Sequence, residues 1–403
     1  MRISTSTIYN ANVTSMDNLQ VQIAKITQQM STGQRIQNPA DDPVGSARAI
    51  ELTLSDSTNT QYTANRNAAT NTLSLSDGIL QSVTTLLQNV HDTVVSASGS
   101  SVTDTSRKSM ATDLQGQLQT LLGLANSTDG AGSYLYSGGQ GSVQPFANTA
   151  TGVTYQGDDV QRKVQVAPSR QLSSSDSGAD IFMRIRNGNG TFQASAGATN
   201  AGSGIVSQGT VTDSSLYTGD NYRVVFGAGG TTFGVTDLTS GATVIPAGTT
   251  YASGQAISFN GIQFSISGTP ANGDTFNVKP SSNQSVFDTL TKLIATLNTP
   301  ISGASTAVVT ANSQALSDGL NSLTQDLNNV LGIRATTGSR LNELTSLQTT
   351  GDQLGLQYKQ TLSTIEGTDY TQAATDLAQQ KLALQAAQQS FAQVSKLSLF
   401  NYL

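Results

Sequence analysis

The sequence has 403 residues, of which 11% are charged, and its 20 basic and 26 acidic side chains give a formal net charge of −6. Because no basic run occurs, this balance argues against a nucleic-acid partner. The chain has no cysteine, which excludes disulfides and thiolate metal sites and leaves the redox compartment open. A surface this poor in charge repels other copies weakly, which is compatible with polymerisation.

The sequence predicts neither a cleavable secretory signal nor membrane insertion. The opening segment MRISTSTIYNANVTS contains Arg2 but lacks the apolar stretch of about 7 to 15 residues that a signal peptide needs. No apolar run reaches the roughly 18 residues that cross a bilayer. If the protein leaves the cell, we expect it to use a route that does not read a cleavable signal.

An apolar stripe of helical period marks the first predicted helix. Its members recur at steps of three and four residues and therefore lie on one face of the helix. They are Met16, Leu19, Ile23, Ile26 and Met30. The helix should end near Gly33, because the surrounding segment STGQRIQNPADDP is rich in residues that end helices.

A second helix is predicted to begin at Pro43, which suits the first helical turn, after the N-cap type residues Asp41 and Asp42. Two adjacent carboxylates also admit an acid/base site, but capping explains both without catalysis. The helix should run to about Ala97. Its second half carries a seven-residue apolar repeat that is typical of a bundle core. The repeat consists of Leu73, Leu80, Leu87 and Val94, with Val83, Val90 and Ala97 between them.

A third helix is predicted after the turn SGSSVTDTS, folding back along the second. Its apolar positions are Ala111, Leu114, Leu118, Leu121 and Ala125. From about residue 130 to 280, short alternating apolar runs separated by turn residues predict strands. Those between Tyr134 and Phe182 are expected to lie on the helices as hairpins, with turns at Gly138-Gly139 and Gly157-Asp158. The block 188–280 is interpreted as an insertion.

Helical spacing returns after the β-rich block and ends in a second terminal stripe. The returning positions are Phe287, Leu290, Ile294 and Leu297, then Leu316, Leu320, Leu323, Leu327 and Val330. The terminal stripe has Leu377, Leu384 and Phe391 seven residues apart, followed by Val394 and the tail LSLFNYL with Leu399, Phe400 and Leu403. Neither terminal stripe is wide enough to be buried on all sides. Each therefore needs the other stripe, or the helices of neighbouring copies, as a partner.

These elements predict an α+β fold. We expect an elongated multi-domain chain in which long helices from both termini form a coiled coil and a helical bundle, with a central β-rich insertion. The predicted domains are a terminal coiled-coil assembly domain (1–42 and 360–403), a helical bundle with β-hairpins (43–187 and 281–359) and an outer β-rich domain (188–280).

No pattern predicts a catalytic, cofactor-binding or metal site. His91 is the only histidine, so no histidine cluster exists, and its flanks NVHDTV place it on the polar side of a helix. The GAGG segment at 227–230 matches neither the dinucleotide nor the P-loop pattern and predicts a hairpin turn. The acidic segments GDD at 157–159 and GDN at 219–221 are interpreted as turns rather than as calcium loops.

Two terminal segments, MSTGQRIQNPADDPVGSARAIEL and DLAQQKLALQAAQQSFAQVSKLSLFNYL, resemble the N- and C-terminal signatures of the flagellin-like family. The opening MRIST, the NPADDP variant, the SYLYSGG turn and the IRATTGSRLNEL stretch resemble the members found where the flagellar hook meets the filament. The resemblance covers both helical flanks and leaves out the central β block.

The resemblance implies a structural adaptor of the external flagellum, exported unfolded through the flagellar type III apparatus, without catalysis. It implies a ring of identical subunits between hook-associated protein 1 on the hook side and flagellin on the filament side, with an export chaperone before secretion. The residues of the two terminal stripes named above, including Val394, Leu399, Phe400 and Leu403, would form the assembly interface.

Two other interpretations stay open. One is a flagellin filament subunit, which shares both terminal signatures. The other is a surface adhesin or enzyme with its activity in block 188–280, although that block has no histidine, no cysteine and few carboxylates.

Overall fold

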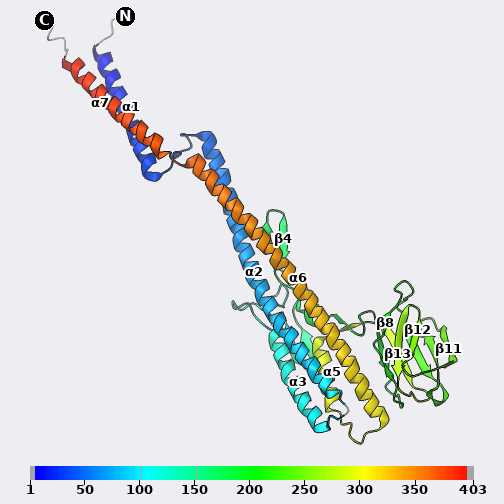
Figure 1. Ribbon diagram of the computed structural model, residues 1–403. Helices are drawn as coiled ribbons and strands as arrows, with labels where there is room; N and C mark the ends of the chain where they lie inside the picture. The colour runs from blue at the N-terminus through cyan, green and yellow to red at the C-terminus, as the bar shows by residue number, and fades with distance from the viewer. Residues whose placement is uncertain (1–4, 100, 151, 397–403) are drawn as a thin grey trace, which may run out of the picture. The chain divides into compact units, whose positions relative to one another are not determined.

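A computed structural model describes residues 5–99, 101–150 and 152–396 of the chain. Within them, long helices occupy both ends and strands the middle (Figure 1). The helices are α1 (Thr5–Thr32), α2 (Pro43–Ala97), α3 (Asp104–Ala125), α4 (Gly178–Phe182), α5 (Val286–Asn298), α6 (Thr306–Glu366) and α7 (Tyr370–Lys396), with a 3₁₀ turn η1 (Ala228–Gly230). The predicted α+β class is confirmed.

The strands are short and concentrated between α3 and α5. They are β1 (Phe146–Thr149), β2 (Gly152–Tyr155), β3 (Lys163–Ala167), β4 (Arg170–Ser173), β5 (Ile185–Arg186), β6 (Phe192–Ala196), β7 (Ile205–Val206), β8 (Thr210–Val211), β9 (Tyr222–Phe226), β10 (Thr232–Asp237), β11 (Thr243–Thr250), β12 (Ala256–Phe259), β13 (Ile262–Ser267), β14 (Thr275–Pro280) and β15 (Asn283–Gln284).

The ends of the long helices follow local sequence signals. Helix α1 ends before Gly33, whose φ of 71° and N–H bond to the Gln29 carbonyl oxygen at 2.9 Å form a glycine C-cap. Helix α2 begins at Pro43, as predicted. Helix α6 extends well past Val330, where the apolar spacing ended, because isolated glycines such as Gly332 weaken a helix by only about 1 kcal/mol.

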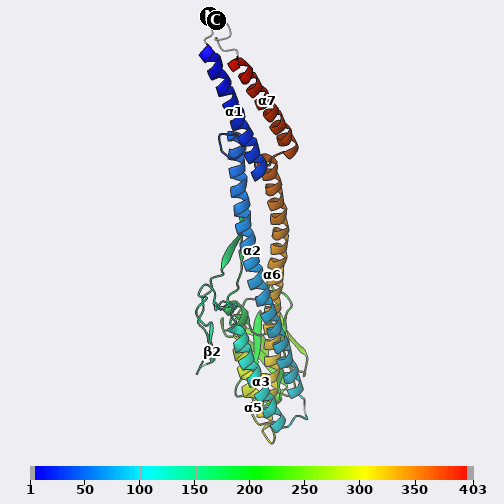
Figure 2. The ribbon, with the colours of Figure 1, turned by 90° about the vertical axis from the view of Figure 1, so that its left-hand side faces the viewer.

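The chain divides into two compact units. The first consists of residues 1–64 and 346–403, as far as they are described, and the second of residues 65–345. In the first unit, α1 and α7 lie side by side in both views (Figures 1 and 2). The domain boundaries expected at 42/43 and 359/360 stay predictions.

The second unit contains a helical core made by α2, α3, α5 and α6. The apolar repeat of α2 is buried there, as predicted, with Leu80, Leu87 and Val94 all fully shielded from solvent. Helix α3 lies along α5 (Figure 2). Phe146, Phe182 and Phe287 form an aromatic cluster within this core, with ring centroids 5.3 to 6.0 Å apart.

Two hairpins are present between α3 and α4, but neither turns at the predicted glycines, although Gly138-Gly139 does form a turn of its own. Strand β1 pairs with β2, and β3 pairs with β4 through a turn at Pro168. Gly139 and Asp158 lie in loops instead, where the Gly139 N–H donates to the Asp158 carboxylate at 2.7 Å. The glycine signals therefore mark two loops that bind each other, and the segment ends in helix α4 rather than in a strand.

The outer block, defined as residues 188–280, contains two antiparallel sheets around a second apolar core. One sheet has the order β11-β10-β9-β14-β6, and the other β12-β13-β7 with β8 also paired to β13. Tyr222, Phe226 and Phe276 are fully buried between them. The GAGG segment forms the turn between β9 and β10, as predicted.

Candidate assembly interface

Helices α1 and α7 present matching half-buried stripes. All five predicted α1 residues, from Met16 to Met30, are half-buried, whereas most residues between them are exposed. On α7 the shielded positions include Leu377, Leu384 and Phe391 and also follow alternating steps of three and four residues. The Tyr9 and Phe391 rings lie 5.0 Å apart, so the two stripes meet along this seam.

The last four residues of the predicted assembly interface are not among the half-buried seam residues just described. The side chain of Val394, and Leu399, Phe400 and Leu403 entirely, lie outside the described residues. The seam between α1 and α7 accounts for one side of each helix within a single chain. Whether the same residues also contact neighbouring copies stays a prediction.

The structure also reveals apolar residues that the search for stripes missed. Val21 on α1 is 67% exposed and Leu382 on α7 is 68% exposed. At about 100° per residue, each lies on the face of its helix opposite the seam. Val44, Ile50 and Leu54, at the start of α2, are also exposed. A single apolar residue outside an apolar repeat gives no periodic signal in the sequence. Several exposed apolar residues on the first unit, however, mark a candidate contact surface.

Backbone hydrogen bonds link the segment that follows α1 to the segment that precedes α7, and we call this linkage the joint. The Arg35 N–H donates to the Glu366 carbonyl oxygen at 2.6 Å, and the Thr368 N–H donates to the Gly33 carbonyl oxygen at 3.0 Å. The Arg35 guanidinium also donates to the Ile365 carbonyl oxygen at 2.8 Å and to the Asp42 carboxylate at 3.1 Å. The break after α1 is thereby tied to the break before α7.

Asp41 and Asp42 are structural parts of this joint. Asp42 caps α2 by accepting the Gly45 N–H at 2.9 Å, as predicted. Asp41 does not cap α2, which corrects the prediction for this residue. It accepts the backbone N–H groups of the preceding turn at Gln37 and Asn38, and pairs with Lys25 at 2.7 Å.

The electrostatics of the pair oppose an acid/base role. The hydrogen bond from Lys25 and those from the backbone lower the pKa of Asp41 to about 2. The Gly45 N–H and the Arg35 guanidinium lower the pKa of Asp42. Both carboxylates are therefore held ionised, whereas a general acid needs a raised pKa.

Other chemical candidates do not converge on a site. His91 is half-exposed on α2 beside Asp92, with 3.5 Å between ring nitrogen and carboxylate. In the part of the chain that the structure describes, no group of three or more histidine or acidic side chains is arranged to hold a metal ion. The same residues include no helix that is long and apolar enough to cross a membrane.

Two carboxylates with raised pKa values, buried Asp326 and half-buried Asp318, were missed because they lie within otherwise ordinary helical spacing. Burial raises the pKa of Asp326 to about 7 and that of Asp318 to about 6. Asp326 is buried in the helical core, and its Oδ2 atom has no hydrogen-bond partner. Asp318 accepts the side-chain amide of Gln314 at 2.8 Å. In sequence alone, an aspartate on a long polar helix is expected to face solvent.

Comparison with known proteins places the chain in a family. The family described as bacterial flagellin N-terminal helical region matches residues 3–140, and the D2-like domain of flagellar hook-associated protein 1 matches residues 195–280. Flagellar hook-associated protein 3 of Escherichia coli (strain K12) is 30% identical over 400 residues, which cover 99% of each chain.

Solved structures agree with the sequence relatives. The flagellar junction protein FlgL from Legionella pneumophila is 31% identical with a TM-score of 0.71, covering 79% of this chain and 100% of that one. FlgL of Xanthomonas campestris is 32% identical with a TM-score of 0.71, covering 76% of this chain and 98% of that one. The chain therefore belongs to the flagellar hook-associated protein 3 family and is a structural component of the bacterial flagellum.

Proposed function

We propose that the chain is a non-enzymatic adaptor that forms the junction between hook-associated protein 1 on the hook side and the flagellin filament. The observation that carries this proposal is its relation to hook-associated protein 3 over the full length of both chains. Identical subunits assemble into a ring outside the cell after export, without a cleavable signal and with the help of an export chaperone.

The terminal helices are the proposed means of assembly. Helices α1 and α7 bury one stripe against each other and leave Val21 and Leu382 exposed on their opposite faces. Exposed apolar side chains of this size gain free energy when a neighbour covers them. We assign the opposite faces of α1 and α7 to contacts with adjacent subunits, together with Leu399, Phe400 and Leu403 of the tail.

The filament-subunit alternative is supported by the match of residues 3–140 to the flagellin N-terminal region. It predicts that the purified chain extends filaments without limit, whereas a junction protein should add only a short segment. The match of residues 195–280 to a domain of another flagellar protein favours a role for the outer block within the flagellum over adhesion or catalysis.

A deletion strain tests the adaptor function. We expect electron microscopy to show hooks without filaments, and flagellin to accumulate in the medium. The full chain should restore filaments, whereas a chain that lacks residues 397–403 should not, although it is still exported. Filaments of normal number and length in the deletion strain would contradict the proposal.

A further inference from the structure

Gln314 on α6 binds the backbone of the outer block like an added strand. Its Oε1 atom accepts the Val206 N–H at 2.8 Å, and its Nε2 donates to the Val206 carbonyl oxygen at 3.1 Å. Val206 belongs to β7, which is an edge strand, and is itself buried. The Gln314 side chain therefore satisfies two polar groups that would otherwise be buried without partners.

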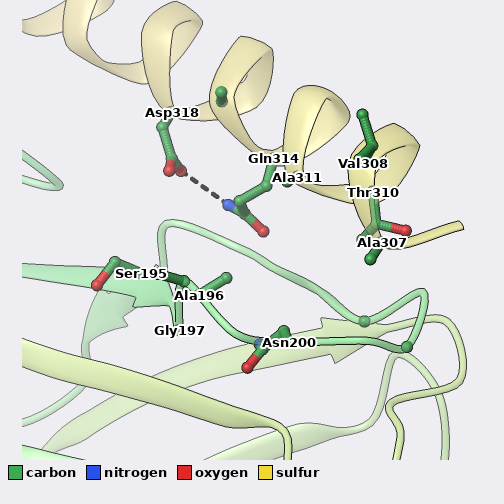
Figure 3. Close-up of a pocket in the computed structure, with 14 residues that line it drawn as sticks. Ser195, Ala196, Gly197, Asn200, Ala307, Val308, Thr310, Ala311, Gln314 and Asp318 are labelled. Atoms are coloured by element: carbon green, nitrogen blue, oxygen red, sulfur yellow. Dashed lines mark hydrogen bonds between the residues drawn. The ribbon is translucent and has the colours of Figure 1, made fainter. Parts of the chain in front are cut away.

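Asp318 fixes the orientation of that amide. Its Oδ1 atom accepts the second Nε2 hydrogen of Gln314 at 2.8 Å, one turn further along α6 (Figure 3). A flipped amide would turn its oxygen toward both the Asp318 carboxylate and the Val206 carbonyl oxygen, and would lose all three hydrogen bonds. Gln314 and Asp318 thus act as one unit, which we call the latch.

The outer block is joined to the helical core at a narrow neck. At the base of the block, β5 pairs with β15. Next to this pair, the Asn187 Oδ1 accepts the Ser282 N–H at 2.9 Å and the Ser281 Oγ hydroxyl at 3.2 Å, and the Asn187 N–H donates to the Ser282 carbonyl oxygen at 3.0 Å. The two chain segments that link the outer block to the helical core therefore pass through one site, whereas the latch binds the block at β7.

Two cavities adjoin the latch. One, of about 350 Å³, lies between residues 195–204 of the outer block and residues 307–318 of α6 (Figure 3). The other, of about 430 Å³, is lined by Gln193 of the outer block and by residues of α5 and α6. Asp318 lines both cavities. Sparse packing here leaves little besides the latch to hold the block against α6.

The surroundings of Asp318 offer little to stabilise its charge. Lys292 on α5 lines the same cavity, but within the described residues Asp318 forms no ion pair. Asp326 follows two turns along α6. From the outer block, Asp274 is turned to the backbone N–H groups of Ala201, Gly202 and Ala271, while Asn200 and Gln193 face the cavities as neutral amides.

We propose that Gln314 and Asp318 form a proton-controlled latch that holds the outer block against α6, and that its opening lets the block turn about the Asn187 neck. Opening hydrates the Asp318 carboxylate, so ionisation favours the open state and protonation favours the closed state. A protonated carboxyl still accepts the Gln314 amide through its carbonyl oxygen, so the contact persists at low pH.

The coupling between proton binding and closure sets how strongly pH shifts the closed-to-open ratio of the latch. Burial raises the pKa of Asp318 to about 6 in the closed state, and full hydration would return it toward 3.8 in the open state. From these two values, the closed-to-open ratio rises about tenfold between pH 8 and pH 5. The sign follows because the closed state binds the proton more tightly.

Distance measurement on the full chain tests the latch. The native sequence has no cysteine, so Ala242→Cys on the outer block and Asn328→Cys on α6, both at exposed positions, carry spin labels without background. We expect the distribution of label distances to narrow from pH 8 to pH 5. Gln314→Leu removes the hydrogen bonds to Val206 and should give the broad distribution at both pH values.

Two further variants separate the latch from general effects. Asp318→Asn keeps an acceptor for Gln314 without a charge, so it should give the narrow distribution at both pH values. Asp352→Asn removes a carboxylate from an exposed site on the same helix and should respond to pH like the parent chain. A parent distribution that does not change with pH overturns the proposal, and so does an Asp318→Asn variant that keeps the full response, even if Gln314→Leu fails to fold.

Discussion

Asp326 links the stability of the second unit to pH. The residue is 1% exposed, and burial raises its pKa to about 7, against a smaller opposing effect of a hydrogen bond with Thr289. A carboxyl whose folded pKa lies above its unfolded value of 3.8 contributes stability below that value, and the contribution is lost as pH rises through 7. The second unit should therefore be less stable at pH 8 than at pH 5, as far as this group is concerned.

The variant Asp326→Asn tests this residue. It removes the buried charge and keeps a side chain of the same shape, so we expect it to raise the free energy of unfolding by about 2–3 kcal/mol more at pH 8 than at pH 5. Urea denaturation at the two pH values measures both numbers. An equal change at pH 5 and pH 8 would contradict the assignment of the pH effect to Asp326.

Arg107 ties three helices together inside the same core. It is 2% exposed on α3, and its guanidinium donates to the Asn312 Oδ1 on α6 at 2.6 Å and to the Thr296 carbonyl oxygen on α5 at 3.1 Å. Arg107→Met would leave these acceptors without their charged donor, so we expect a loss of about 2–4 kcal/mol in the free energy of unfolding.

Thermal or urea unfolding measures that loss. The adjacent exposed residue supplies the control, because Lys108→Met also removes one positive charge from α3 but no buried hydrogen bond. It should change stability by less than about 0.5 kcal/mol. Equal effects of the two substitutions would show that Arg107 acts through net charge alone.

At the scale of elements, the pairing of α1 with α7 depends on their shared seam. Leu384 is half-buried there, and Leu382, two residues away, is exposed on the opposite face. We expect Leu384→Ala to speed amide hydrogen exchange throughout α1, because the seam loses apolar contact. Leu382→Ala should leave exchange in the unassembled chain unchanged. If both variants behave alike, the seam is not where the structure places it.

Elements with long, regular apolar spacing were predictable from sequence. The repeat from Leu73 to Val94 gave the buried face of α2, and Gly33 and Pro43 gave the ends of α1 and α2, because both signals are local. The outer block was recognised as strands, but its sheet order was not predicted, since pairing between distant strands leaves no mark in either strand alone.

Side-chain contacts between distant segments were the least predictable part of the structure. Gln314 and Val206 are 108 residues apart, and neither belongs to a motif. Asp41 shows the same limit within a short segment. Its residue type indicated a cap for α2, but the Lys25 side chain and the turn at Gln37 attract its carboxylate instead. Which partner a polar side chain binds depends on the groups that lie within hydrogen-bonding distance once the chain has folded.

At the scale of the whole molecule, apolar side chains are exposed on the terminal helices α1 and α7. Helices α1 and α7 cover one face each and expose Val21 and Leu382 on the other, and Arg35 ties the break after α1 to the break before α7. The proposed adaptor function requires that neighbouring subunits cover the exposed faces. Loss of those contacts should stop filament growth without changing the fold of the single chain.

The most direct test is complementation of the deletion strain with the double variant Val21→Gln, Leu382→Gln. We predict normal export of the variant, hooks without filaments in electron micrographs and flagellin released into the medium. The exposed polar substitution Gln379→Ala, also on α7, should restore filaments fully. Normal filaments with the double variant would contradict assembly through the outward faces of the terminal helices.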